Sequence, residues 1–115
     1  MSAKFPAGKL PPRQYYRINY PAKARPALMV FDHAFEVLDL SERGIRFKLG
    51  DAVAPSAGNE FEGVVRFKQG ATAEISGTIL RVIDGEVAAA LERGVPASLI
   101  RSEQRYLLEN SRRFT

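Results

Sequence analysis

Two short motifs in this 115-residue chain carry side chains suited to binding an anionic ligand. The first places Arg13 and Arg17 in the pattern RxxxR, and the second joins Asp39, Ser41 and Gly44 in the pattern DxSxxG. An arginine guanidinium pairs through two parallel hydrogen bonds with phosphate oxygens, or with O6 and N7 of a guanine. Two spaced arginines, with a carboxylate and a hydroxyl, therefore favour recognition of a guanine or phosphate group.

The positive charge of the chain is concentrated at its N-terminal end. The whole sequence has 17 lysines and arginines against 13 aspartates and glutamates, a net charge of +4. Six of the basic residues precede the first acidic residue, Asp32, so the rest of the chain holds 11 bases and 13 acids. A local excess of positive charge indicates a local anionic partner, such as a nucleotide, a nucleic acid, a membrane surface or an acidic protein face. Five prolines favour an irregular backbone in this stretch: Pro6, Pro11, Pro12, Pro21 and Pro26.

From residue 27 onward the sequence alternates between apolar and polar residues in the manner of short β-strands. The alternation predicts six strands, at residues 27–31, 35–40, 44–49, 60–68, 72–83 and 87–91. A turn is expected at Asp32-His33, and Gly77 is a candidate bulge. Asp84-Gly85 is the strongest signal for a hairpin turn. Short strands joined by turns in this way predict a small antiparallel barrel.

The spacing of apolar residues becomes helical after Gly94, and Pro96 can open a helix that runs to about Asn110. The predicted fold is therefore mainly β, a six-stranded antiparallel β-barrel with a C-terminal α-helix. We divide this single domain into a basic N-terminal arm, residues 1–21, and a barrel with its helix, residues 22–115.

The composition excludes several classes of function. The chain has no cysteine and one histidine, which removes disulfides, thiolate nucleophiles and multi-histidine metal sites. It contains no phosphate-binding P-loop, no dinucleotide fingerprint and no nucleophile elbow, so we expect neither an enzyme nor a bound metal or cofactor. No apolar run approaches the roughly 20 residues that span a bilayer, and no secretory segment follows Met1. We expect a cytoplasmic protein without membrane insertion.

The two motifs in this order, followed by a barrel and a helix, resemble a PilZ domain, the bacterial receptor module for cyclic di-GMP. The resemblance extends from about Arg13 to the C-terminal helix. It implies that Arg13 and Arg17 bind guanine and phosphate, and that Asp39, Ser41 and Gly44 form the floor of the site. The family often binds an intercalated dimer of the ligand, and four further basic residues are candidate contacts on charge and predicted placement: Lys9, Arg43, Arg46 and Arg81.

The floor residues leave alternatives open. Asp39 can accept hydrogen bonds from a guanine or orient an arginine of the RxxxR motif, while the Ser41 hydroxyl can donate to phosphate. Both side chains could instead cap a tight turn. Gly44 would let the backbone turn sharply and the ligand approach closely.

The sequence thus predicts a stand-alone PilZ-type receptor that binds cyclic di-GMP, orders its arm over the barrel and relays the signal to a protein partner. Members of the family commonly affect motility or biofilm formation. A first alternative is a PilZ-fold adaptor that acts by protein contact without nucleotide. A second is a small nucleic-acid-binding barrel, which is disfavoured because the tyrosines cluster in the arm and the barrel is slightly acidic.

Overall fold

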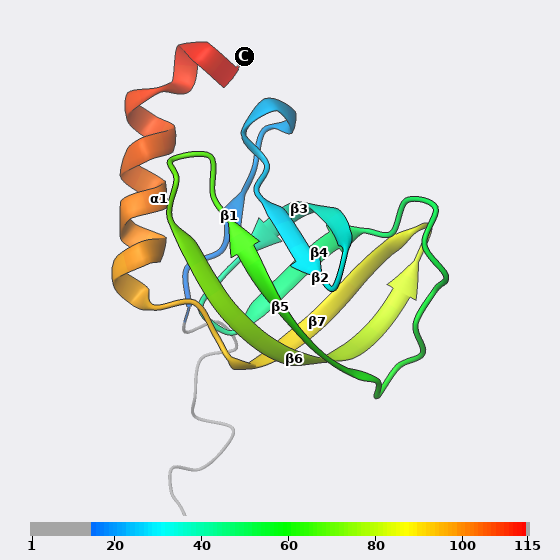
Figure 1. The fold of residues 1–115 in the computed structure, drawn as a ribbon. Coiled ribbons are helices and arrows are strands. Elements are labelled where there is room, and N and C mark those ends of the chain that lie inside the picture. Colours follow the sequence, from blue (N-terminus) through cyan, green and yellow to red (C-terminus); the bar gives the residue numbers. More distant parts are fainter. Residues whose placement is uncertain (1–14, 115) are drawn as a thin grey trace, which may run out of the picture.

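Six antiparallel strands follow the alternation of the sequence and close into a barrel in the computed structural model, which describes residues 15–114 (Figure 1). They are β2 (Ala27–Val30), β3 (His33–Leu40), β4 (Gly44–Lys48), β5 (Glu60–Arg66), β6 (Thr72–Ile83) and β7 (Glu86–Arg93). The pairing order is β3-β2-β5-β6-β7-β4, and β4 pairs again with β3, which closes the barrel. The prediction of a mainly β fold, a six-stranded antiparallel barrel with a C-terminal helix, is confirmed.

Apolar side chains that alternate along the strands fill the barrel. In β7, Val87, Ala89 and Leu91 are buried, whereas Ala88 and Ala90 between them are only half-buried. This alternation is the structural expression of the period of two in a strand, which sends successive side chains to opposite faces. The hydrophobic core therefore lies inside the barrel, and the middle of the outer face of β7 presents the small side chains of Ala88 and Ala90.

Of the two tight turns predicted from the sequence, one lies where it was predicted and the other lies one residue earlier. Asp84-Gly85 joins β6 to β7 with φ angles of 52° and 76°, so the predicted hairpin turn is confirmed. The turn between β2 and β3 lies at Phe31–Asp32, one residue earlier than predicted, because Val30 pairs with His33. Phe31 has a φ of 53°, which a bulky residue rarely adopts, and local turn preferences therefore gave no signal for this position.

The bulge predicted at Gly77 lies opposite it, on β7: Ser76 pairs with Arg93 and Gly77 with Leu91, so the extra residue is Glu92. The register between β6 and β7 shifts between Ser76 and Gly77. A β-carbon on Gly77 would lie 2.3 Å from the carbonyl oxygen of Ala90, so the close approach of β7 requires glycine here.

A seventh, very short strand lies in the predicted arm. Strand β1 (Ile18–Asn19) pairs with β3, with Ile18 opposite Leu40 and Asn19 opposite Asp39, and a short 3-10 helix, η2 (Ala22–Ala24), follows it. Ile18 and Tyr20 belong to the hydrophobic core. Two residues are too few to show periodicity, so the sequence predicted no strand here.

Helix α1 (Ala97–Glu109) packs along one side of the barrel, as predicted, and ends in the short 3-10 helix η3 (Ser111–Phe114) (Figure 1). Its buried residues are Ile100 and Glu103. The link from β7 passes so close to the β3–β4 turn that a β-carbon on Gly94 would lie 1.7 Å from the carbonyl oxygen of Glu42. No helix within residues 15–114 is long and apolar enough to cross a membrane.

Candidate ligand-binding site

The site begins with an ion pair between the RxxxR and DxSxxG motifs. Nη1 of Arg17 donates to Oδ1 of Asp39 at 2.6 Å. Strand β1 starts at the next residue and pairs with the end of β3, which brings the two motifs together although 22 residues separate these side chains. The pairing of β1 with β3 therefore positions an arginine of the arm on the barrel surface.

Asp39 is held by a second arginine as well. Nε of Arg46 donates to Oδ2 of Asp39 at 2.7 Å, since Arg46 lies opposite Asp39 in the β3–β4 pair. The Asp39 side chain is only 4% exposed, because the guanidinium groups of Arg17 and Arg46 cover it. The hydrogen bond to Asp39 is the largest contribution that raises the pKa of Arg46 above its usual value. Of its two predicted roles, Asp39 thus has the second in this structure, which is to orient arginines.

A register shift in β3 lies beside this carboxylate. The pairing of β3 with β4 is irregular between Val37 and Asp39. Such bulges re-aim a side chain and are frequent next to binding sites. The extra residue is Leu38, which directly precedes the first residue of the DxSxxG motif.

Gly44 provides the space in which Arg17 lies. A β-carbon on Gly44 would be 3.1 Å from Nη2 of Arg17 and 3.5 Å from Oγ of Ser41. Among the described glycines, the four with positive φ are Gly50, Gly58, Gly70 and Gly85, so Gly44 does not have the left-handed backbone of a sharp turn. The close approach of the arginine, rather than the turn, favours glycine at this position.

Ser41 is buried beside Gly44 and belongs to the β3–β4 turn. Its backbone N–H donates to the carbonyl of Gly44 at 2.9 Å, and its Oγ accepts a long hydrogen bond of 3.4 Å from the N–H of Arg43. The turn-capping alternative thus describes part of what Ser41 does. Its hydroxyl hydrogen, which can rotate, is the donor that a phosphate oxygen would need.

The further basic candidates fall in different places. Arg43 turns toward β7, where its Nη1 donates to the carbonyl of Glu92 at 2.7 Å. Arg81 lines a hollow together with Arg46. Arg13 and Lys9 lie outside the described residues.

Three residues of the site carried no motif signal: Glu86, Ala88 and Ala90. Glu86 accepts a hydrogen bond from Nη1 of Arg46, and the side chains of these two residues are 40% and 38% exposed. Ala88 lies opposite Arg46 and Ala90 opposite Gly44 in the β4–β7 pair. Strand β7 therefore presents small side chains beside Arg46 and Gly44. The alanine run at 88–90 was the only sequence signal for this feature.

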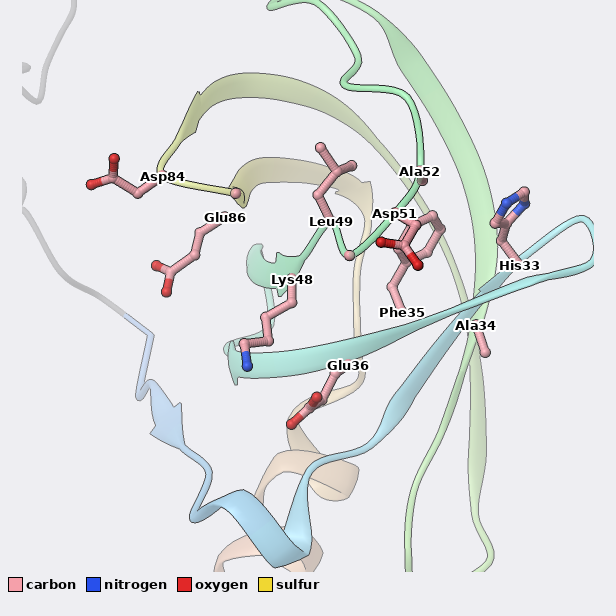
Figure 2. A pocket seen from close by; sticks show the side chains of 12 residues that line it. His33, Ala34, Phe35, Glu36, Lys48, Leu49, Asp51, Ala52, Asp84 and Glu86 are labelled. Atoms are coloured by element: carbon pink, nitrogen blue, oxygen red, sulfur yellow. The ribbon is translucent and has the colours of Figure 1, made fainter.

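A larger hollow of about 580 Å³ opens at the end of the barrel near the β6–β7 turn (Figure 2). Glu86 and Asp84 lie at one rim and His33 at the other, with Phe35 and Leu49 between them. The Glu86 side chain points away from Phe35 and Leu49. Glu86 therefore lines both this hollow and the smaller one that Arg46 and Arg81 line. Its hydrogen-bond partner, Arg46, lies on the side of the barrel that carries the two motifs.

The fold and the site together define a small antiparallel β-barrel with a C-terminal helix and a cluster of arginines on its outer face. A family model described as the PilZ domain matches residues 11–109, so the chain belongs to the PilZ family. A comparison with curated proteins finds no match.

Among solved structures, the fold is similar to that of the Bacillus subtilis inhibitor of motility, MotI/DgrA. The TM-score is 0.63 with 13% sequence identity, over 89% of this chain and 52% of that one. This chain therefore spans about half the length of that protein. At this identity the similarity extends to the fold alone.

Proposed function

We propose that this protein binds cyclic di-GMP through Arg13, Arg17, Asp39, Ser41 and Gly44, and that binding orders the N-terminal arm for recognition by a protein partner. The observation that carries the proposal is the pairing of Arg17 with Asp39 directly above Gly44. This pairing joins the two motifs that the family resemblance associates with the ligand.

The chemistry of the ligand fits this surface. Cyclic di-GMP has two phosphates and two guanines, and a guanidinium can pair bidentately with either group. Arg17 is fixed at one edge by Asp39, and its side chain is still 42% exposed, so its outer edge can reach a ligand. The small residues Gly44, Ala88 and Ala90 leave room for a planar base beside it.

Several contacts must act together. One bidentate pair contributes about 1–3 kcal/mol, whereas micromolar binding requires about 8 kcal/mol. Ordering the arm also costs about 1–2 kcal/mol for each residue that becomes fixed. Arg46 and Arg81 are the described candidates for additional contacts, since both line a hollow next to the motif residues.

The proposal is tested by calorimetric titration of the purified protein with cyclic di-GMP. Arg13→Ala, Arg17→Ala and Ser41→Ala should each weaken binding, the arginine variants by about 5- to 150-fold if each loses one bidentate contact. Arg101→Ala is the matched control. Arg101 and Arg105 repeat the RxxxR spacing and are exposed on α1.

Two outcomes would contradict the proposal. An equal loss with Arg101→Ala would show that the wrong pair of arginines has been assigned. A wild-type protein that gives no heat at micromolar concentrations would favour the adaptor alternative. One observation is compatible with that alternative: Arg17 and Arg46 already have carboxylate partners within the chain.

A further inference from the structure

A row of alternating charges runs across the outer face of the barrel. Asp39 binds Arg17 through one oxygen and Arg46 through the other, and Arg46 continues to Glu86. The four side chains come from the arm, β3, β4 and β7. Arg46 therefore bridges two carboxylates, and its Nε and Nη1 groups are both occupied.

The two carboxylates of this row are not equivalent. Asp39 is 4% exposed and is held by two guanidinium groups, whereas Glu86 is 40% exposed and pairs with Arg46. An exposed ion pair contributes little, because water solvates both of its charges. An anion that arrives from solvent can therefore replace Glu86 on Arg46 much more easily than it can replace Asp39.

Glu86 also cancels the positive charge of the neighbouring hollow. Six residues line this hollow of about 380 Å³: Arg46, Arg81, Ile83, Asp84, Glu86 and Ala88. Its two arginines are balanced by Asp84 and Glu86, so its formal charge is zero. Arg81 forms no ion pair with any residue between 15 and 114, which leaves it available to a ligand.

We propose that Glu86 limits the affinity of this surface for its ligand, as an internal anion that competes with a phosphate group of the ligand for Arg46. This inference rests on the proposed binding of cyclic di-GMP and adds a regulator of its affinity. A ligand phosphate gains Arg46 only by displacing Glu86 or by lying beside it. Displacement gives up an ion pair, and lying beside it brings two negative charges together. Either way, the carboxylate weakens binding.

The test compares dissociation constants for cyclic di-GMP in wild type and in Glu86→Gln, which removes the charge and keeps the shape. The variant should bind about two- to fivefold more tightly, the equivalent of one exposed ion pair. Glu62→Gln is the matched control. Glu62 is an exposed carboxylate on β5, the strand opposite β4 in the barrel order, so its loss changes the net charge equally without touching the site.

Repeating the comparison in an Arg46→Gln protein separates two effects of Glu86: competition with the ligand for Arg46, and simple repulsion between the carboxylate and the ligand phosphate. In an Arg46→Gln protein, Glu86→Gln should no longer tighten binding, because the guanidinium to be released is gone. A gain of the same size in that background would overturn the inference, as would unchanged or weaker binding by Glu86→Gln alone. If the wild type itself does not bind, the proposed function fails and the inference fails with it. Binding by wild type with no gain in Glu86→Gln refutes the inference alone.

Discussion

Replacement of Glu103 tests whether a buried carboxylate joins α1 to the rest of the fold. Glu103 is 1% exposed. Its Oε1 accepts a hydrogen bond of 2.6 Å from the Tyr20 hydroxyl, and its Oε2 accepts one from Nε2 of Gln69. Tyr20 directly follows β1, and Gln69 lies in the β5–β6 turn. One side chain thus connects the helix to two other parts of the chain.

Glu103→Ala should destabilise the protein by about 2–4 kcal/mol. Hydrogen bonds to a charged group contribute about 1.5–3 kcal/mol each, and the Tyr20 hydroxyl would be left buried without a partner. Relief from burying a carboxylate offsets part of this loss. In a domain whose total stability is about 5–15 kcal/mol, the change should lower the Tm by roughly 10 °C.

Glu103→Gln should differ from the wild type in how its stability depends on pH, because the amide does not ionise whereas the Glu103 carboxyl does. Burial is the main cause that raises the pKa of Glu103 above its ordinary value of 4.5, and the hydrogen bonds from Tyr20 and Gln69 oppose it. The folded protein therefore holds a proton that the unfolded chain has already released, over the interval from pH 4.5 to the raised pKa. The wild type loses stability from this group as the pH rises through that interval. The amide, which cannot ionise, does not.

The assay is urea unfolding of both proteins at a series of pH values. Subtracting the two free energies of unfolding cancels the other titrating groups. The difference, variant minus wild type, should rise between pH 4.5 and the raised pKa and then stay constant. Ile100→Ala, a substitution of a buried apolar residue on the same helix, should destabilise by an amount that does not vary with pH in this way. A difference that is flat or falls with pH would refute the account of Glu103.

Three further substitutions have distinct expected outcomes. Gly44→Ala should change stability by less than about 1 kcal/mol, because only the flexible end of Arg17 must move, yet weaken cyclic di-GMP binding about tenfold in calorimetry; equal binding would contradict the close-approach role. Gly94→Ala should destabilise by about 3 kcal/mol or more in urea unfolding, since its β-carbon would overlap the backbone oxygen of Glu42; a near-neutral result would show that the link can move aside. Phe31→Asn should raise stability by about 1 kcal/mol, because asparagine tolerates the positive φ and the phenyl ring is almost fully exposed; a lower Tm would mean that the ring makes a stabilising contact.

Much of the fold could be predicted from local patterns. The strand positions, the Asp84-Gly85 turn and the C-terminal helix all follow from preferences within a few residues. The misplaced β2–β3 turn shows the limit of such patterns. Pairing of β2 with β3 fixed the turn at Phe31, against the local preference for a residue that accepts positive φ.

The sequence by itself determined the motifs, the concentration of positive charge in the arm, and the barrel with its helix. Only the tertiary structure decided how the charges pair. Asp39 meets Arg17 and Arg46, which are 22 and 7 residues away, and Arg46 meets Glu86 across 40 residues. Glu103 meets Tyr20 across 83 residues. Periodicity reports which face of its own element a side chain occupies. The partner on that face is set by strand register and helix docking, which depend on contacts between distant parts of the chain.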